Sequence, residues 1–371
     1  MKQGWEYKKI GNICNITTGK LDANAANEDG LYPFFTCSRI PLSINTYAYD
    51  CECILIAGNG DLNVKYYNGK FNAYQRTYIL QLKNDVNGVE MRYIFAFFNL
   101  YIEELRRKSI GGIIKYIKLG DLTNALLPLP DITTQLSIVS ELDKINELIR
   151  LKKEQLKDYD NLAQSIFYEM FGDPVENEKG WEVKKWKEVF NTILGKMLDK
   201  SKQINHLKQY KYLANMNVQW GYFDLKELRS MTFTDEELAK YELRNYDFLI
   251  CEGGDAGRCA IWKETDETIL FQKAIHRARL IDTDNADVVY IRYWMQFYKV
   301  NKGLKDYISK STIEHLTGDK LKRLPIPLPP LPLQHLFAQR IEQIERQKPA
   351  VQKSITDLET ILASRMQYWF E

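Results

Sequence analysis

The stretch DLTNALLPLPDITTQLSIVSELDKINELIRLKKEQLKDYDNLAQSIFYEMFG covers residues 121–172, and KLKRLPIPLPPLPLQHLFAQRIEQIERQKPAVQKSITDLETILASRMQYWFE covers residues 320–371. The two stretches align without a gap. The alignment pairs Pro128 with Pro327, Pro130 with Pro329, Gln135 with Gln334, Ile138 with Phe337, Leu142 with Ile341, Ile145 with Ile344, Leu156 with Ile355, and Tyr159 with Leu358. A chain in which a compact block and a long helix occur twice has an internal pseudo-twofold axis. Such an object suits a target with two halves, and duplex DNA is the commonest target of that kind.

The compact blocks are duplicated as well. Each opens with Gly-Trp-Glu, at Gly4 and at Gly180, and each opening leads to a Gly-Lys pair. The segments ILIAGNGD (54–61) and FLICEGGD (248–255) both read as an apolar strand that runs into a Gly-rich turn. Two pairs of dipeptides echo each other farther on: Gln75-Arg76 with Gln272-Lys273, and Tyr93-Ile94 with Tyr290-Ile291. Short β-rich runs, turns and one helix in each block predict an α/β (α+β) fold.

Both helices carry apolar residues at steps of three and four, the pattern of a heptad seam. The seam residues are Ile138, Leu142, Ile145, Ile149 and Leu156 in the first helix, and Phe337, Ile341, Ile344, Val351, Ile355 and Leu358 in the second. A seam of about five heptads favours a coiled coil in which each helix is roughly 55 Å long. The alternative is that each helix packs on its own block. Pro349 lies inside the second helix, and we expect it to kink or break that helix.

A proline ladder precedes each helix, in Leu127–Gln135 and in Ile326–Gln334. Proline fixes φ and biases the preceding residue toward extended geometry, so we expect stiff, extended connectors. The alternative is a proline-rich ligand for a partner domain. Thr133 or Thr134 is the expected N-cap of the first helix.

Composition limits the class of protein. With 371 residues, 45% of them hydrophobic, there is room for two or three domains, each with a core. The chain has no run of about 18 apolar residues, and the polar start MKQGWEYKK has no apolar signal region, so we expect neither a membrane span nor secretion. The six cysteines do not repeat between the halves and lack zinc-ligand spacing, which fits reduced thiols in the cytoplasm and no metal. Net charge is +2, with a basic segment 1–120 and an acidic segment 121–172.

Polar side chains near the Gly-rich turns could contact base edges or phosphates. The candidates in the first block are Asn59, Lys65, Tyr74, Gln75 and Arg76, followed by Lys108, Ser109, Gly111 and Gly112. The candidates in the second block are Lys196, Arg258, Gln272, Lys273, His276 and Arg277, followed by Lys310, Ser311 and Thr312, with the Lys-Ser dipeptides taken as equivalent. Lys196 also begins a basic run that contains Lys200, Lys202, His206, Lys208 and Lys211. The alternatives are plain tight turns and solvated surface residues.

Signatures of catalysis are missing from the sequence. It contains no Walker A motif, no Asn/Asp-Pro-Pro-aromatic tetrapeptide of amino-methyltransferases and no convincing carboxylate-lysine cluster of a nuclease. The duplicated proline ladder that ends in glutamine, the Gly-Trp-Glu openings, and the run LYPFFTCS followed by ILIAGNGD and FNAYQRTYIL resemble the DNA-specificity subunit of type I restriction-modification systems.

The resemblance implies a domain plan and a set of partners. Residues 1–131 and 173–331 would be target-recognition domains, each of which reads one half of a split, asymmetric site in double-stranded DNA. The central helix 132–172 and the C-terminal helix 332–371 would pair antiparallel, set the spacer and dock two methyltransferase subunits, which a restriction subunit joins. S-adenosylmethionine would bind to the methyltransferase, so we expect no cofactor and no catalysis in this chain.

Two other classes stay open. One is an enzyme, such as a nuclease or methyltransferase with an unrecognised site, which would bind a cofactor or a divalent metal as the purified chain. The other is a coiled-coil adaptor with protein partners only, which would lack steeply salt-dependent affinity for DNA.

Overall fold

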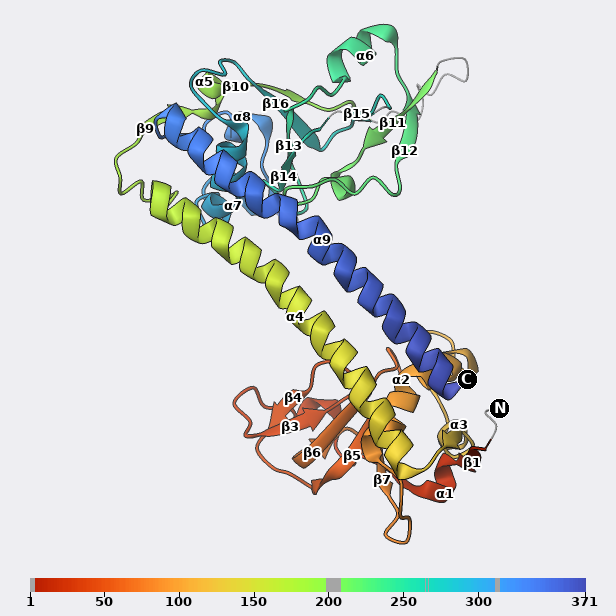
Figure 1. Ribbon diagram of the computed structural model, residues 1–371. Helices are drawn as coiled ribbons and strands as arrows, with labels where there is room; N and C mark the ends of the chain where they lie inside the picture. The colour runs from red at the N-terminus through yellow and green to blue at the C-terminus, as the bar shows by residue number, and fades with distance from the viewer. Residues whose placement is uncertain (1–3, 198–207, 264, 266, 311–313) are drawn as a thin grey trace. The chain divides into compact units, whose positions relative to one another are not determined.

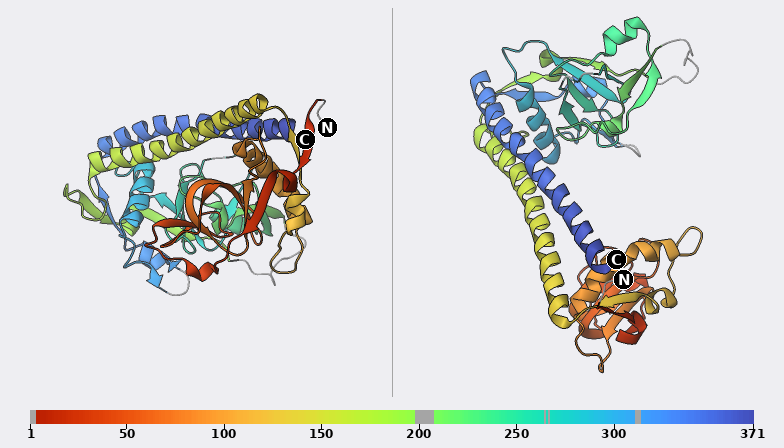
Figure 2. Two further views of the ribbon diagram at one scale, coloured as in Figure 1. Left: turned by 90° about the horizontal axis from the view of Figure 1, so that it is seen from below. Right: turned by 45° about the vertical axis from the view of Figure 1, so that its right-hand side comes forward.

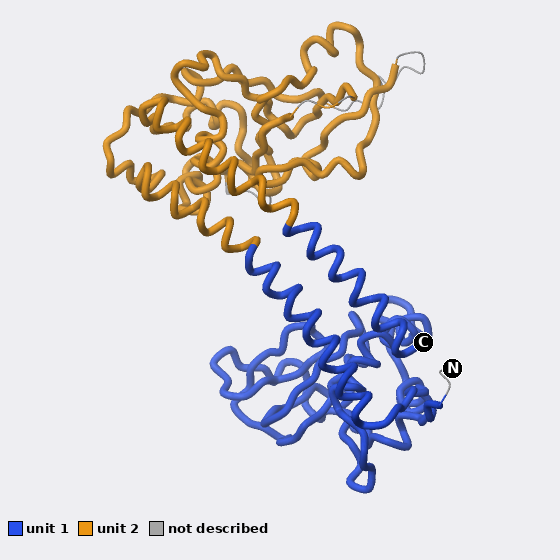
Figure 3. Tube along the Cα trace, viewed as in Figure 1, with its two compact units in different colours: residues 1–155, 351–371 blue, residues 156–350 orange. Residues whose placement is uncertain are grey.

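The computed structural model describes residues 4–197, 208–263, 265, 267–310 and 314–371 (Figure 1). It divides into two compact units, each of which is described by itself below. Unit 1 comprises residues 1–155 and 351–371, and unit 2 comprises residues 156–350 (Figure 3). Each of the two long helices therefore contributes residues to both units.

Unit 1 is built on a six-stranded sheet of strand order β2-β7-β5-β6-β3-β4, in which only β3 and β6 are parallel neighbours. Its strands are β2 (Cys14–Thr18), β3 (Tyr32–Phe35), β4 (Leu42–Ile44), β5 (Tyr49–Ala57), β6 (Val64–Ala73) and β7 (Thr77–Leu82). On β5, Ile54 and Ile56 face one apolar core, whereas Cys53 and Leu55 face another. Because both faces are covered, the strand reads as a continuous apolar run.

Helix α2 (Met91–Lys108) packs its apolar stripe against one face of this sheet. Seven of its residues are buried at helical spacing: Met91, Tyr93, Ile94, Phe97, Phe98, Ile102 and Leu105. The shorter elements of unit 1 are β1 (Glu6–Lys9), α1 (Ile10–Ile13), η1 (Ala23–Ala25), α3 (Leu119–Thr123) and β8 (Leu126–Leu129). The expectation of a mixed α/β block in the first half is confirmed.

Unit 2 has a four-stranded sheet of order β10-β16-β13-β14 and a three-stranded sheet of order β12-β11-β15. On β13, Phe248 and Ile250 face the core that contains helix α7, whereas Leu249 and Cys251 face the core shared with the smaller sheet. The strands are β9 (Glu182–Lys185), β10 (Phe190–Leu194), β11 (Gln209–Leu213), β12 (Arg229–Thr232), β13 (Phe248–Cys251), β14 (Cys259–Ile261), β15 (Leu270–Phe271), β16 (Ile275–Leu280), β17 (Ser309–Lys310), β18 (Glu314–His315) and β19 (Pro325–Leu328). The helices are α5 (Trp186–Val189), η3 (Asn215–Asn217), α6 (Asp235–Tyr241), α7 (Val288–Val300) and α8 (Gly318–Leu321).

The proline ladders form strands, which corrects their assignment as connectors alone. In unit 1, β8 pairs antiparallel with β1, so that Pro128 lies opposite Tyr7. In unit 2, β19 pairs antiparallel with β9, so that Pro327 lies opposite Val183. Each pair is an isolated two-stranded ribbon, where the missing N–H of proline interrupts no wider sheet. The residues from the glutamate of each Gly-Trp-Glu opening onward and the ladder are therefore the two strands of one ribbon.

Two repeat-related side chains fasten each ladder to its unit. In unit 1, Tyr93 Oη donates to Pro128 O at 2.6 Å, and Gln135 Nε2 donates to Pro130 O at 2.8 Å. Gln135 Oε1 also accepts from Glu90 N, the N-cap of α2, at 2.9 Å.

The same contacts recur in unit 2. Tyr290 Oη donates to Pro327 O at 2.7 Å, and Gln334 Nε2 donates to Pro329 O, also at 2.7 Å. Gln334 Oε1 accepts from the backbone N–H of Asp287, the N-cap of α7, at 2.9 Å. The side chains that the alignment paired thus serve one structural purpose in both units.

The two long helices are α4 (Ile132–Phe171) and α9 (Leu331–Phe370), which agree with the expected helical ranges to within one residue. Asp131 directly precedes α4. Its Oδ1 accepts from Thr134 N at 3.0 Å and its Oδ2 from Thr134 Oγ1 at 2.7 Å. Asp131 is thus the N-cap, and the prediction of Thr133 or Thr134 is wrong because both lie within the first turn.

Helix α9 continues through Pro349, so the predicted break is wrong. Proline removes one helical hydrogen bond and crowds the preceding turn. Apolar residues on both sides of it are nevertheless buried, with Ile344 exposed by 7% and Val351 by 6%. Tertiary packing of the flanking turns holds the helix together across this position.

Within unit 1, the N-terminal part of α4 packs against the C-terminal part of α9. Glu141 accepts a hydrogen bond from Trp369 Nε1 at 3.0 Å and is paired with Arg365. Within unit 2, the C-terminal part of α4 packs against the N-terminal part of α9, where Lys348 Nζ lies 2.7 Å from Asp160 Oδ1. The helices are therefore antiparallel in each unit, side by side in both views of Figure 2.

The seam residues are buried or half-buried. The buried ones are Ile138, Leu142, Ile149, Phe337, Ile341, Ile344, Val351 and Ile355, and the half-buried ones are Ile145, Leu156 and Leu358. Several of them also belong to a block core, as Leu142 does in unit 1 and Phe337 in unit 2. Each helix therefore packs both on the blocks and on the other helix.

Candidate nucleic-acid interface

Three segments of unit 1 meet at Gly58, which directly follows β5. Its backbone N–H donates to Arg76 O at 2.8 Å, and its carbonyl accepts from Ile117 N at 3.0 Å. Gly58 thus joins the turn that holds Gln75 and Arg76 to the loop that precedes α3. A side chain would not fit at this position, because a Cβ atom on Gly58 would lie 2.5 Å from Arg76 O.

The same junction occurs in unit 2 at Glu252, which directly follows β13. Glu252 N donates to Ala274 O at 2.8 Å, and Glu252 O accepts from Leu316 N at 2.7 Å. Strands β5 and β13 carry the repeated sequence ILIAGNGD and FLICEGGD. In each unit the repeated sequence therefore contains the residue at which the three segments meet. We name these points the Gly58 junction and the Glu252 junction.

A hairpin supplies the third segment of the Gly58 junction. Ile110 pairs antiparallel with Tyr116, and Tyr116 pairs in turn with Asn59 of the Gly-rich turn. Gly111 and Gly112 lie in the tip of the hairpin and are exposed. Two stretches that the sequence analysis selected separately, around Asn59 and around Gly111, are thus brought together.

The hairpin of the Glu252 junction shows that one predicted equivalence is wrong. Ser309 pairs with His315, and His315 pairs with Gly253 of the second Gly-rich turn. His315 therefore corresponds to Tyr116, at the offset of the helices. In this register Lys310 does not correspond to Lys108, because backbone pairing and not the Lys-Ser dipeptide fixes the equivalence. Ser311 and Thr312 lie outside the described residues.

The Gly-Lys pair that ends each opening contacts the second segment of each junction. A Cβ atom on Gly19 would lie 2.1 Å from Ala73 O, and one on Gly195 would lie 2.4 Å from Gln272 O. Both glycines therefore allow another backbone to pass directly over them. The repeated glycine reflects this close approach, a cause that the spacing in the sequence did not indicate.

An aspartate in each Gly-rich turn is held by a cation from the neighbouring helix. In unit 1, Arg106 Nη2 donates to Leu62 O at 2.8 Å and lies 3.7 Å from Asp61 Oδ1. In unit 2, Lys299 Nζ donates to Ala256 O at 2.7 Å and is paired with Asp255. Neither cation was predicted from the sequence, although the repeated aspartate was a signal for them.

The charge of the aspartate is thus neutralised by a cation in each turn. In unit 1, hydrogen bonds from Arg39, together with the charges of Arg39, Arg106 and Lys65, hold the pKa of Asp61 below its usual value. Asp61 therefore stays ionised and paired near neutral pH.

The selected residues of unit 1 lie around the Gly58 junction with different exposure. Gln75, Arg76, Lys108, Gly111 and Gly112 are exposed, whereas Asn59, Lys65, Tyr74 and Ser109 are half-buried. Lys65 donates to Asn63, and burial lowers its pKa. Ser109 Oγ donates to Arg106 O at 2.7 Å. Lys108 is engaged within the unit, since its Nζ donates to Tyr101 Oη at 3.0 Å and lies 3.4 Å from Glu104 Oε1. Gln75 and Arg76 are therefore the exposed side chains best placed to reach a ligand without rearrangement.

In unit 2, Lys273 is exposed, while Lys196, Arg258 and Gln272 are half-buried. Lys196 Nζ lies 2.6 Å from Glu237 Oε2, and Arg258 Nη2 donates to Asn215 O at 2.8 Å. Both cations are therefore engaged inside the unit. Of the basic run that begins at Lys196, the residues Lys200, Lys202 and His206 lie outside the described residues.

His276 and Arg277 are buried, with exposures of 2% and 8%, and the structure does not place them at the surface as the sequence analysis expected. Arg277 Nη1 donates to Lys240 O at 3.0 Å and to Glu242 O at 2.8 Å. Burial lowers the pKa of Arg277 to about 10 and also lowers the pKa of His276. Their position on β16, whose two faces are both covered, gives these side chains a structural role.

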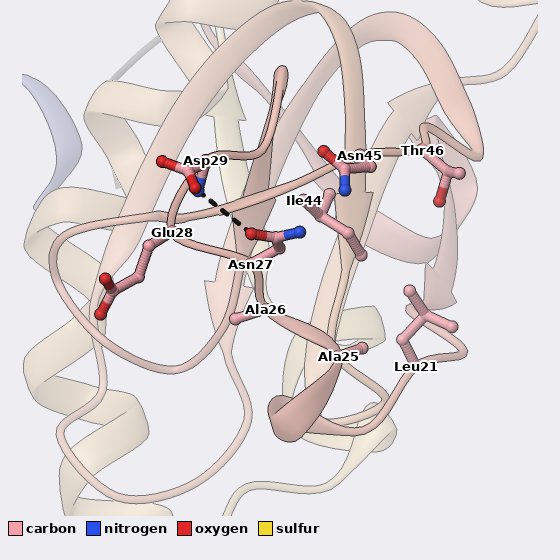
Figure 4. Close-up of a pocket in the computed structure, with 9 residues that line it drawn as sticks. All are labelled: Leu21, Ala25, Ala26, Asn27, Glu28, Asp29, Ile44, Asn45 and Thr46. Atoms are coloured by element: carbon pink, nitrogen blue, oxygen red, sulfur yellow. Dashed lines mark hydrogen bonds between the residues drawn. The ribbon is translucent and has the colours of Figure 1, made fainter.

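A separate open pocket in unit 1 carries little that would attract DNA (Figure 4). Its lining includes the carboxylates of Glu28 and Asp29 and no basic side chain. Asn27 Oδ1 accepts from Asp29 N at 3.1 Å, so this amide is used within the turn. Two carboxylates without a cation would repel phosphate, so this pocket is not part of the candidate interface.

One family of known proteins matches most of the chain. The sequence model of the type I restriction modification DNA specificity domain matches residues 2–158 and again residues 178–359. The chain belongs to this DNA specificity family. Each matched stretch of this family member contains one junction, Gly58 in the first and Glu252 in the second.

Relatives and solved structures agree with the assignment. The specificity subunit of the type I restriction enzyme EcoDI of Escherichia coli is 23% identical, with 95% of this chain and 84% of that protein covered. The MjaVIII specificity subunit of Methanocaldococcus jannaschii is 21% identical over 92% of this chain and 86% of that protein. The S subunit of a type I system from M. genitalium, at 13% identity, has a TM-score of 0.60 and covers 100% of this chain and 98% of that one.

A second solved chain shares the fold of this DNA specificity family member. It comes from work on complex assembly and conformational transition of the type I restriction-modification system. It is 18% identical, with a TM-score of 0.60 and coverage of 100% of this chain and 98% of that one. Among the described residues, no helix is long and apolar enough to cross a membrane.

Proposed function

We propose that this chain is the DNA-specificity subunit of a type I restriction-modification complex, in which each unit reads one half of a bipartite, asymmetric target. The duplicated junction carries the proposal. Each unit gathers three surface segments around one backbone residue, Gly58 or Glu252, directly after a buried central strand. Loops placed on a rigid sheet in this way are suited to base readout.

The two junctions differ in chemistry, which supports an asymmetric target. Asn59 in unit 1 corresponds to Gly253 in unit 2, and Tyr116 corresponds to His315. Asn59 carries an amide where Gly253 has no side chain, and the phenol of Tyr116 and the imidazole of His315 offer different sets of donors and acceptors. Since base edges are distinguished by such sets, each unit would select its own half-site.

Helices α4 and α9 would set the spacer and dock two methyltransferase subunits, which a restriction subunit would join. Support comes from their antiparallel packing in each unit and from apolar side chains that they leave in solvent. On α4, Leu148, Leu151 and Leu162 are 47%, 46% and 47% exposed. On α9, Leu336 and Ile361 are 43% and 48% exposed. Exposed apolar residues on a helix pair are suited to a protein partner.

The chain itself would carry out no chemistry. In the proposed complex the methyltransferase subunits hold S-adenosylmethionine and modify adenine, while this chain selects the site. Equilibrium dialysis of the purified chain with S-adenosylmethionine tests this division, since binding by the chain alone would favour an enzyme.

Long-read sequencing of adenine methylation tests the function directly. Cells with the gene should show one split, asymmetric methylated motif, and deletion of the gene should remove it. Re-expression of the full chain should restore the same motif. A methylome unchanged by deletion, in cells whose methyltransferase subunit is expressed, would contradict the proposal.

A further inference from the structure

The loop between β3 and β4 adds a fourth segment to the Gly58 junction. Cys37 Sγ donates to Arg76 O at 3.6 Å, and Asn63 Nδ2 donates to Cys37 O at 2.9 Å. The loop is therefore anchored to the Gly-rich turn and to the turn that holds Gln75 and Arg76. Arg39 is an exposed residue of this loop. It was not among the candidate DNA-contacting residues predicted from the sequence.

Arg39 is held side-on by an aspartate of the Gly-rich turn. Arg39 Nε donates to Asp61 Oδ2 at 2.6 Å, and Arg39 Nη2 donates to Asp61 Oδ1 at 3.3 Å. The side chains are 68% and 57% exposed. An exposed pair of this kind contributes little to folding stability, so its geometry calls for another explanation. The pairing fixes the plane of a guanidinium that faces solvent.

The side-on pairing leaves one edge of the guanidinium unused. Nε and one N–H of Nη2 face Asp61, whereas the N–H groups of Nη1 and the second N–H of Nη2 do not. Two parallel donors on that edge match the O6 and N7 acceptors of guanine in the major groove. The carboxylate also disfavours a phosphate as the ligand, because it already neutralises the cation, whereas the neutral base edge needs only the donors.

We propose that Arg39, oriented by Asp61, reads a guanine in the half-site that unit 1 binds. The inference rests on the proposed function and adds a base to it. In unit 2 the corresponding aspartate, Asp255, accepts from Trp220 Nε1 at 2.9 Å and is paired with Lys299. Neither partner presents two parallel donors of a fixed plane, so this arrangement does not recur at the equivalent aspartate of unit 2.

The test uses the full chain, co-expressed with its methyltransferase subunit in a methylation-free bacterial host, with the host chromosome as the probe. Wild type, Arg39→Ala and Arg39→Lys are compared by long-read sequencing of adenine methylation. We expect the wild-type half-site for unit 1 to contain a guanine that Arg39→Ala no longer requires. Discrimination at that position should fall about 5- to 150-fold, while the other half-site stays unchanged. Arg39→Lys should keep methylation but lose part of the discrimination, since an ammonium lacks the planar pair of donors.

Arg107→Ala is the matched control. Arg107 lies on α2 of the same unit, where its exposed guanidinium is 3.0 Å from Glu104 Oε2. Its substitution should leave the motif intact.

Three results would overturn the inference. The first is a unit 1 half-site without a G·C pair. The second is an unchanged motif in Arg39→Ala. The third is an equal loss of methylation at every site in both Arg39 variants, with a smaller salt dependence of DNA binding, which would indicate a phosphate contact. In each case the split motif of the wild type still supports the proposed function. If the wild type specifies no split motif, the proposed function fails and the inference with it.

Discussion

Gln135 and Gln334 are amides that solvent does not reach, since both are 0% exposed. Each links the loop before a block helix to the end of a proline ladder. The alignment marked these residues as a pair, but it could not say what they bind. Their partners are backbone groups that lie 45 and 47 residues away in the chain. Contacts of that separation are invisible to a pattern that runs along the sequence.

Substitution of Gln135 by alanine should destabilise unit 1. The change would leave the N–H of Glu90 and the carbonyls of Gly88 and Pro130 without this partner. We expect the free energy of unfolding to fall by about 1–3 kcal/mol, measured by urea denaturation. Ser137→Ala, at an exposed position on the same helix, is the control, with a change of about 0.5 kcal/mol or less. Equal effects of the two substitutions would contradict the assigned role.

The placement of His276 and Arg277 illustrates why individual contact residues were harder to predict than the repeat. Polar residues in a short strand suggest a solvent-facing side. Strand β16 instead lies between two cores, so that Ile275 faces one and Ala278 faces the other. Two of the three strands of the smaller sheet that covers the second face, β11 and β12, come from distant sequence. Exposure at these positions therefore depends on tertiary structure that local pattern does not contain.

At the scale of elements, periodicity predicted the long helices well and their interruptions poorly. The apolar seam, together with the proline ladder before it, predicts α4 and α9 to within one residue, because a stripe sustained over many turns has one consistent register. Pro349 misled the prediction because a local rule was applied where packing on both sides overrides it. The ribbons of β1 with β8 and of β9 with β19 were missed, since the extended geometry that proline imposes was assigned to connectors and does not reveal a pairing partner.

Pro349→Ala should stabilise α9. Alanine restores a helical N–H and removes the clash with the preceding turn, which in a helix interior together amount to about 3 kcal/mol. Because Pro349 is exposed, the substitution disturbs no core. We expect a higher midpoint of thermal unfolding than in the wild type. Gln347→Ala, at an exposed neighbouring position, should leave the midpoint nearly unchanged. A midpoint for Pro349→Ala at or below the wild-type value would show that the packing of the flanking turns depends on the proline.

For the whole molecule, the sequence predicted the duplication and the mixed α/β class of each block. It did not predict that every block is completed by pieces of both helices. In unit 1, Phe370 at the end of α9 packs on Tyr93, with ring centroids 5.1 Å apart. In unit 2, Phe171 at the end of α4 packs on Tyr290, with ring centroids 4.7 Å apart. Each tyrosine thus contacts the helix that ends in its unit.

Exchange of residues 1–130 for the corresponding domain of another family member should change one half of the methylated motif. The Gly58 junction lies entirely in the exchanged segment, and the Glu252 junction is untouched. The incoming domain needs a tyrosine at the position equivalent to Tyr93, because the Tyr93 side chain packs on Phe370 and donates a hydrogen bond to Pro128 O. Methylome sequencing is the measurement, and the reciprocal exchange of residues 173–329 is the control. A change in both halves of the motif after a single exchange would refute the modular assignment.

The junctions at Gly58 and Glu252 are held by hydrogen bonds between main-chain atoms, and this affects how the protein can evolve. A backbone hydrogen bond survives replacement of most side chains around it. A point mutation in the neighbouring loops can therefore change the side chains that would face the DNA without breaking the hydrogen bonds of the junction. Position 58 is constrained to glycine, whereas position 252 already carries a glutamate. The exposed loop side chains of each unit can therefore change separately during evolution, while the buried tyrosines, glutamines and prolines stay the same.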